Sequence, residues 1–178
     1  MRWILFLVCL WPTAASANDW DALDQPGAVA IMRHALAPGT GDPADFELGD
    51  CSTQRNLSED GRQQARSVGD AFRKRGIVFD RIFASQWCRT RETAELLALR
   101  PVVEMPALNS FFGDYSTQQS QTQATKALIE KQQGRVLLVS HQVNISALAG
   151  QATRSGEVLI IRAGTEGMEV MGSILIQP

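Results

Sequence analysis

The sequence has little of what marks a nucleic-acid binder or a chain of several domains. Its 17 Lys and Arg residues are balanced by 19 Asp and Glu residues, giving a formal net charge of −2. No strongly basic surface is therefore indicated, and we expect no nucleic-acid partner. No internal repeat, low-complexity tract or long Pro/Gly/Ser linker divides residues 18–178. With 44% hydrophobic residues, the chain is long enough for one globular domain with a sizeable core.

An apolar run opens the chain but is too short to cross a membrane. Arg2 precedes apolar residues 3–11, and the small residues Ala15-Ser16-Ala17 follow. A bilayer-spanning helix needs about 20 apolar residues. The pattern is typical of a cleaved secretory signal over residues 1–17, followed by a mature domain at 18–178. We therefore expect an exported, periplasmic protein without a stable membrane anchor, and the alternative is an uncleaved anchor.

Cysteine is scarce. The chain has three cysteines, and loss of the signal segment with Cys9 would leave Cys51 and Cys88. An exported compartment is usually oxidising enough for two cysteines to pair. From composition alone, a disulfide and two buried free thiols both remain open.

Short apolar runs alternate with helical patterns along most of the chain, and Gly and Pro break the pattern between about residues 38 and 57. Ser58 offers a helix N-cap and Gly76 a helix end. Strands are expected at 28–32, 80–84, 102–103 and 136–139, helices at 58–76, through 93–97 toward Arg100, at 117–132 and at 143–149, and a terminal hairpin at 157–161 and 168–176. This order predicts a single α/β domain, a three-layer α/β/α sandwich with a mostly parallel central sheet.

Histidine is also scarce, and both histidines stand where an apolar strand ends. Residues 29–32 precede Arg33 and His34, and residues 136–139 precede Ser140 and His141. Ligands of open parallel sheets bind beyond the carboxyl ends of the strands. We therefore expect both imidazoles to face one crevice.

Three arginines stand near the same strand ends. Arg33 adjoins His34, Arg55 lies just before the helix that starts near Ser58, and Arg89 lies early in the next helix. Guanidinium groups bind phosphoryl oxygens through paired, charge-assisted hydrogen bonds. The pattern indicates a local site for a phosphorylated ligand.

Four segments carry a more specific signal: IMRH at 31–34, RNLSEDGRQQA from Arg55, ASQWCRTRETA from Ala84 and LLVSHQVNI from Leu137. In this order they resemble the motifs of the histidine phosphatase superfamily, which includes phosphoglycerate mutases and acid phosphatases. The resemblance covers about residues 28–150. Arg55 at the head of its segment is similar to the short phosphohistidine-phosphatase branch.

The resemblance implies a metal-independent hydrolase with no cofactor, acting on a small phosphorylated substrate. His34 would attack phosphorus and form a phosphohistidine that water later hydrolyses. Arg33, Arg55 and Arg89 would bind the phosphoryl oxygens, and His141 would add a further donor. Arginines would take the place of the metal ion used at many phosphoryl-transfer sites.

The resemblance also bears on the two cysteines. Cys51 lies four residues before Arg55, and Cys88 adjoins Arg89. If both arginines bind one phosphate, the cysteines are drawn together. We therefore hypothesise a Cys51–Cys88 disulfide that braces the pocket.

The chain departs from the family pattern at the general acid. Ala35 stands where glycine is usual, and the region in which many members carry a glutamate offers Asn109 and Ser110. Neither is a competent acid at neutral pH. Glu104 and Asp114 are nearby candidates. Without an acid, the enzyme would prefer easily departing leaving groups, whereas an exported setting favours a phosphosugar or phosphorylated nutrient.

Other functions are compatible with the same residues. A noncatalytic phosphate-binding module would keep the arginine pocket without turnover. A metal-dependent hydrolase built on His34 and His141 is disfavoured, because two histidines without a local carboxylate motif are weak metal evidence. A mutase is disfavoured because a small domain with short loops has little means to keep a phosphorylated intermediate from water.

Overall fold

The computed structural model describes residues 18–165 and 167–176. The predicted signal segment at 1–17 lies outside the described residues. In the described part, no helix is both long enough and apolar enough to cross a bilayer.

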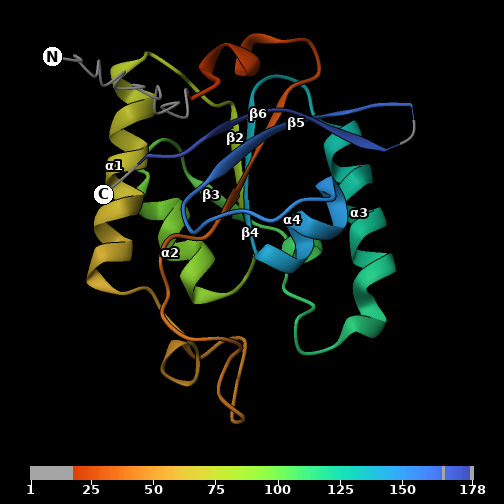
Figure 1. The fold of residues 1–178 in the computed structure, drawn as a ribbon. Helices are drawn as coiled ribbons and strands as arrows, with labels where there is room; N and C mark the ends of the chain where they lie inside the picture. Colours follow the sequence, from red (N-terminus) through yellow and green to blue (C-terminus); the bar gives the residue numbers. More distant parts are fainter. Residues whose placement is uncertain (1–17, 166, 177–178) are drawn as a thin grey trace, which may run out of the picture.

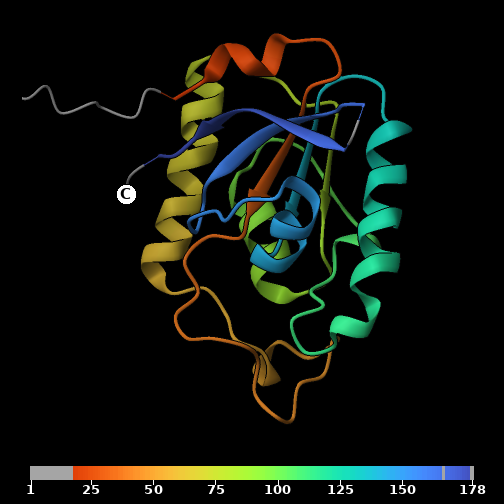
Figure 2. The ribbon, with the colours of Figure 1, turned by 45° about the vertical axis from the view of Figure 1, so that its right-hand side comes forward.

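The described chain forms one central sheet with helices on both faces (Figures 1 and 2). The strands are β1 Val29–Arg33, β2 Arg81–Ala84, β3 Val102–Glu104, β4 Val136–Ser140, β5 Val158–Ala163 and β6 Met168–Ile174. The α-helices are α1 Glu59–Lys74, α2 Cys88–Leu96, α3 Gln118–Glu130 and α4 Gln142–Ala149. Short 3-10 helices lie at Trp20–Asp24, Cys51–Thr53, Pro106–Leu108 and Tyr115–Thr117.

The six strands lie in the order β3-β2-β4-β1-β5-β6. Strands β3, β2, β4 and β1 are mutually parallel, whereas β5 runs antiparallel to both β1 and β6. The predicted hairpin at the end of the chain is confirmed as the β5–β6 pair. Because β1, β4 and β2 are neighbours and parallel, their carboxyl ends meet at one edge of the sheet.

Alternate residues of each central strand pack into two separate cores, one on each face of the sheet. Helices α1 and α2 cover one face, where Val68 and Phe72 of α1 meet Met32 and Val139. Helices α3 and α4 cover the other, where Ile129 and Ile145 meet Ile31 and Leu138. The period of two along a strand places each apolar run against both layers. The predicted three-layer sandwich is confirmed.

Helix α1 begins and ends as its sequence predicts. The Ser58 hydroxyl accepts a hydrogen bond from the Gly61 amide at 3.1 Å, which caps the first turn. At the other end, Gly76 takes a φ of +66°. The Gly76 amide bonds to the Arg73 carbonyl and the Ile77 amide to the Phe72 carbonyl, which is the Schellman arrangement.

Helix α2 is shorter than predicted. The sequence predicts a helix that runs toward Arg100, whereas α2 ends at Leu96 and Ala98 adopts a φ of +50°. The carbonyls of Leu97 and Ala98 turn away to accept hydrogen bonds from Arg73 of α1. The predicted extension toward Arg100 is wrong: the backbone leaves the helix at Ala98, and Arg73 of a neighbouring helix supplies donors for two carbonyls at the helix end, where carbonyls lack a partner within the helix.

Candidate active site

The sheet brings the two histidines side by side. Arg33 of β1 is in register with Ser140 of β4, and the His34 amide bonds to the Ser140 carbonyl at 3.0 Å. The ring centroids of His34 and His141 are 5.7 Å apart. Only 2% of His34 and 3% of His141 is exposed. The strand ends thus fix both imidazoles in one buried position.

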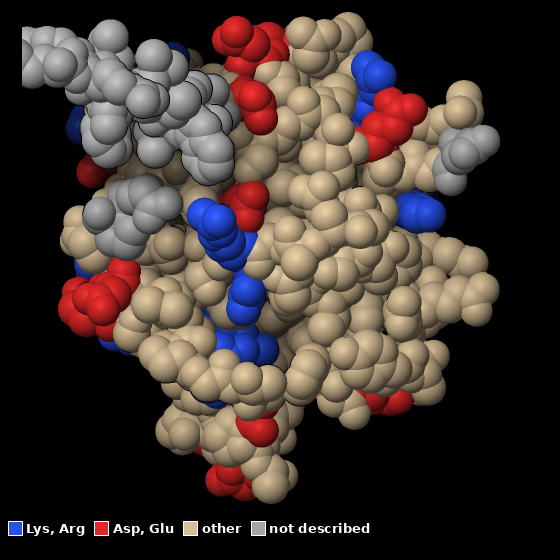
Figure 3. Space-filling view, viewed as in Figure 1, with Lys and Arg blue, Asp and Glu red and all other residues tan. Residues whose placement is uncertain are grey.

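A cavity of about 200 Å³ opens beside these rings. It is lined by all five residues selected from the sequence, namely Arg33, His34, Arg55, Arg89 and His141. In the space-filling view, basic side chains form a column near the middle of the face, and the lower ones lie in a hollow (Figure 3). The structure therefore gathers two imidazoles and three guanidinium groups around one small cavity.

His34 is held as a neutral ring. Its Nδ1 lies 2.7 Å from the Ala35 carbonyl oxygen, and a carbonyl only accepts, so Nδ1 carries the proton and Nε2 does not. Burial lowers the pKa of His34 to about 3; the bond to Ala35 opposes this shift, and the charges of Arg89, Arg33 and Arg55 reinforce it. Nε2 is therefore an unprotonated nitrogen at neutral pH.

His141 contacts both an arginine and a serine. Arg89 donates to His141 Nδ1 at 3.4 Å, and His141 Nε2 lies 2.8 Å from the Ser85 hydroxyl. Burial first, then the charge of Arg89, hold the pKa of His141 well below its ordinary value. Because a guanidinium only donates, Nδ1 accepts in this arrangement and the neutral ring carries its proton on Nε2, toward Ser85. The Ser85 hydroxyl can also donate, so the other neutral tautomer becomes possible when Arg89 leaves Nδ1.

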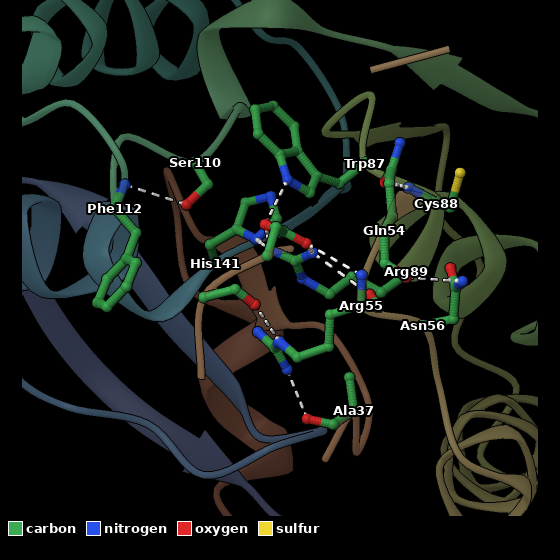
Figure 4. Close-up of polar contacts among 12 residues, drawn as sticks. Ala37, Gln54, Arg55, Asn56, Trp87, Cys88, Arg89, Ser110, Phe112 and His141 are labelled. Atoms are coloured by element: carbon green, nitrogen blue, oxygen red, sulfur yellow. Dashed lines mark hydrogen bonds and ion pairs between the residues drawn. The ribbon is translucent and has the colours of Figure 1, made fainter. Parts of the chain in front are cut away.

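Arg33 and Arg55 are fixed by carbonyl and amide oxygens. Arg33 donates to the Gln142 side chain at 3.2 Å and to the Thr153 carbonyl at 3.0 Å. Arg55 donates to the Gly41 carbonyl at 2.7 Å and to the Ala37 carbonyl (Figure 4). Burial, then the charge of Arg89, lower the pKa of both guanidinium groups. Crowded cations of this kind are stabilised by a bound anion.

Arg89 is paired with a carboxylate that sequence reasoning missed. Its NH1 and NH2 donate to the two oxygens of Asp42 at 2.6 and 3.1 Å. The Trp87 ring N–H and the Arg55 amide also donate to Asp42, at 3.0 and 3.2 Å. Figure 4 shows Arg89, Trp87 and Arg55 gathered near His141. In the sequence, Asp42 stood out only as a loop residue between Gly41 and Pro43, without the strand-end position that identified the histidines.

The two carboxylates proposed as general acids do not line this cavity. Glu104, at the edge of the sheet, accepts from Arg91 at 3.1 Å on the surface. Asp114 accepts from the hydroxyl and amide of Ser116 at 2.6 and 3.0 Å, and these bonds lower its pKa. Both side chains are committed to local surface contacts. Neither is placed to protonate a group held between the two histidines.

The hypothesised disulfide is present. Cys51 and Cys88 are bonded, with their Cα atoms 5.7 Å apart, within the range that a disulfide requires. The bond joins the loop that carries Arg55 to the first residue of α2, next to Arg89. Gln54 adds a second link, because its side-chain oxygen accepts from the Cys88 amide at 2.9 Å.

No candidate metal centre is found in the described ranges 18–165 and 167–176: no three or more His, Cys, Asp or Glu side chains gather in a way that could hold an ion.

Comparison with known proteins finds a family match that includes Arg33, His34, Arg55 and Arg89 and ends before His141. The model of the histidine phosphatase superfamily (branch 1) matches residues 29–127. The Drosophila grimshawi mitochondrial serine/threonine-protein phosphatase Pgam5 is 35% identical over 52 residues, which is 29% of this chain and 18% of that protein. The match thus spans less than a fifth of that relative's length.

Solved structures share the fold at low sequence identity. The protein histidine phosphatase SixA in complex with tungstate superposes with a TM-score of 0.60 at 18% identity, covering 83% of this chain and 96% of that one. An Entamoeba histolytica phosphoserine phosphatase mutant with bound phosphoserine superposes with a TM-score of 0.57 at 13% identity, covering 82% and 95%. These likenesses confirm the fold.

Proposed function

Because this chain belongs to the histidine phosphatase superfamily, we propose that it is a phosphomonoesterase that works through a phosphohistidine on His34. The observation that carries the proposal is the neutral, buried His34 ring on the wall of a cavity that three arginines share. An unprotonated imidazole nitrogen is a competent nucleophile. The surrounding guanidinium groups provide the charge that a transferring phosphoryl group needs.

In the first step, His34 Nε2 forms a bond to phosphorus while the bond from phosphorus to the leaving-group oxygen breaks. In the second, water attacks the phosphohistidine, the N–P bond breaks, and phosphate and neutral His34 result. Arg33, Arg55 and Arg89 hold the phosphoryl oxygens through both steps. When Arg89 turns from His141 Nδ1 to the phosphoryl group, His141 donates from Nδ1 in the tautomer that a hydrogen bond from the Ser85 hydroxyl to Nε2 allows.

The substrate is a small phosphorylated molecule, and the arginines take the role that a metal ion has in other phosphatases. SixA is a protein histidine phosphatase and the Entamoeba histolytica relative a phosphoserine phosphatase, which supports a phosphomonoester or phosphoramidate substrate. We also propose that the domain at 18–178 is exported to the periplasm after loss of residues 1–17. The Cys51–Cys88 bond supports this location, because disulfides persist in oxidising compartments.

A labelling experiment tests the mechanism. Protein mixed with 32P-labelled 4-nitrophenyl phosphate is quenched without acid, and the label is located by peptide mapping. We expect label on His34, no label in His34→Asn, and unchanged turnover in the presence of EDTA. Label on another residue, or turnover lost to the chelator, contradicts the mechanism.

The same experiment separates a noncatalytic phosphate-binding module. Such a protein would bind tungstate or phosphate, as shown by a shifted melting temperature, without releasing nitrophenol. Product release that depends on His34 excludes it.

A further inference from the structure

Within the described part of the chain, Asp42 is the one carboxylate that lines the cavity shared by the two histidines and three arginines, whereas Asp114 lines only a neighbouring cavity. It lies in the loop between β1 and α1, and its side chain is only 16% exposed. A carboxylate beside a phosphate site is unexpected, because the two anions repel each other. We propose that Asp42 is the proton donor to the leaving group, and that substrate phosphate releases it for this role by replacing it on Arg89.

Arg89 is the partner that carboxylate and phosphate would share. Its side chain is 3% exposed, and both terminal nitrogens donate to Asp42. A phosphoryl group that binds the two terminal nitrogens from the cavity competes with Asp42 for these N–H groups. Binding of substrate therefore separates Asp42 from Arg89, while the bonds from the Trp87 ring and the Arg55 amide can keep the carboxyl nearby.

This exchange changes the acidity of Asp42 in the direction that catalysis needs. Burial is the largest influence and raises the pKa of Asp42, but hydrogen bonds and charge from Arg89, with smaller contributions from Trp87 and Arg55, outweigh it and hold the pKa below its ordinary value. When Arg89 transfers to phosphate, burial remains and a second anion arrives. Both favour the protonated carboxyl. Asp42 is thus an ionised partner in the free protein and an acid once substrate is bound.

Asp42 also lies where a leaving group must pass. It borders the phosphate cavity and a neighbouring cavity of about 400 Å³. Phe46 and Trp87, stacked with ring centroids 5.0 Å apart, form one wall of the second cavity, and Phe112 forms another. A phosphomonoester with its phosphate on the arginines and its organic part between these rings has its bridging oxygen beside Asp42.

The proton balance closes over one turnover. Asp42 takes up a proton from solvent as Arg89 moves to the phosphate. In the first step that proton passes to the leaving-group oxygen, which also receives the electron pair of the broken P–O bond. In the second step the Asp42 carboxylate accepts a proton from the attacking water. Phosphate release returns Asp42 to Arg89 and the proton to solvent.

The proposal rests on the proposed phosphatase mechanism and changes its expected substrate range. A chain without a pocket acid is limited to leaving groups that depart easily, whereas one with Asp42 also cleaves phosphate esters of alcohols. This removes the conflict between a missing acid and a phosphosugar or similar substrate.

Two substrates of similar shape test the role. Benzyl phosphate releases an alkoxide unless its oxygen is protonated, whereas 4-nitrophenyl phosphate releases a stable anion. In Asp42→Asn we expect kcat/KM to fall about 10²- to 10⁴-fold for benzyl phosphate, the size of a general acid's contribution, and less than about tenfold for 4-nitrophenyl phosphate. Tungstate should inhibit the variant more strongly, because a competing charge has been removed from Arg89.

Asp45→Asn is the matched control. Asp45 is an exposed residue of the same loop, so this change removes the same charge without touching Arg89, and both substrates should keep their rates. An equal loss on the two substrates in Asp42→Asn would mean that Asp42 only holds the loop, and an unchanged benzyl phosphate rate would remove the acid role. Either result overturns the proposal.

A measurement on the wild-type protein tests the acid role of Asp42 without a variant that could misfold. Across a series of substituted phenyl phosphates, an enzyme that protonates its leaving group shows a shallow dependence of kcat/KM on leaving-group pKa. A steep dependence overturns the proposal for Asp42. Failure to label His34 with 4-nitrophenyl phosphate in this protein instead overturns the mechanism on which the proposal rests.

Discussion

The two halves of the candidate active site are held in place by different forces. His34, His141 and Arg33 stand at strand ends, where the register of β1 with β4 and the two cores position them. Asp42 and Arg55 belong to the loop that joins β1 to α1, where polar contacts and the Cys51–Cys88 bond position them. The proposed nucleophile, His34, is therefore positioned by the sheet, whereas Asp42 and Arg55 are positioned by a loop with separate supports.

This difference predicts that perturbations fall into two groups. Changes at His34 should remove the proposed nucleophile or its proton state and leave anion binding by the arginines. Changes in the loop should alter anion binding and spare His34: binding weakens where Arg55 loses its supports and strengthens where the competing charge of Asp42 is removed. Arg89 contacts both halves, since it bonds to Asp42 of the loop and to His141 after β4.

Replacement of Arg89 should have the largest effect, because Arg89 is the residue that contacts both halves of the site. In Arg89→Met, we expect kcat/KM to fall at least about 10³-fold, since two buried donors to the transferring phosphoryl group are lost. The unpaired Asp42 should also lower the free energy of unfolding by about 3 kcal/mol. Steady-state kinetics and urea denaturation measure the two effects.

The double variant Arg89→Met/Asp42→Asn separates them. It should recover most of the stability without recovering activity, because no buried charge is left unpaired. Recovery of both would show that Arg89 acts on the fold and not on the phosphate.

The strand-end half was open to prediction from sequence, and the loop half largely was not. Apolar runs that end at His34 and His141 specify parallel strands, and parallel neighbours must bring those ends together. Asp42 lies in a Gly- and Pro-rich loop without periodicity, so no local pattern says that it turns back onto Arg89. The end of α2 was missed in a similar way, because the carbonyls that follow it accept from Arg73 of another helix, a contact that no local pattern indicates.

Arg55 and the disulfide are the exceptions in the loop half, since both were inferred from the sequence. The pairing could be inferred before the structure because Cys51 and Cys88 flank two arginines that one ligand would draw together. The sequence did not indicate the role of Asp42. In the structure its carboxylate accepts hydrogen bonds from the Arg55 amide and from the Arg89 side chain.

Loss of the disulfide should have the next largest effect and act on the loop half. The bond links residues 37 apart in sequence, and a closed loop of that size contributes about 4 kcal/mol in the chain-entropy model. In Cys51→Ser/Cys88→Ser we expect unfolding at correspondingly lower urea. Tungstate binding should weaken about tenfold, as expected for one loosened charge-assisted contact.

Labelling of His34 by 4-nitrophenyl phosphate should persist in that variant under conditions in which it remains folded. Wild-type protein treated with reductant is the control and should behave like the double variant. Loss of labelling in a folded sample would mean that the strand-end half also depends on the bond.

The pH dependence of the free energy of unfolding should report on His34 and His141, which belong to the strand-end half. The folded-state pKa of His34, about 3, lies below its unfolded value of about 6.5. The unfolded chain therefore binds the proton first, and stability falls as pH drops below about 6.5. Between pH 7 and pH 5, His34 should cost about 2 kcal/mol, and His141 should add to this in the same direction.

Urea denaturation at pH 7 and pH 5 tests this, with His34→Asn as the comparison. Asn keeps a side-chain N–H near the Ala35 carbonyl and does not titrate, so the variant should lose about 2 kcal/mol less than the wild type over this interval. Identical losses in the two proteins would mean that His34 is not neutral in the folded state.

The smallest effect is expected at Ser85, which touches neither the proposed nucleophile nor the loop carboxylate. Its hydroxyl lies 2.8 Å from His141 Nε2. In Ser85→Ala, His141 loses the partner that lets Nδ1 hold the proton, so we expect about a tenfold fall in kcat/KM, equivalent to one hydrogen bond of about 1.4 kcal/mol. Ser85→Thr keeps the hydroxyl and should restore most of the rate.

Because the loop is untouched in Ser85→Ala, tungstate binding should weaken by the same factor or less, while Arg55 and the disulfide keep their contacts. A loss of several hundredfold would mean that His141 takes a direct part in proton transfer, beyond the binding of one phosphoryl oxygen.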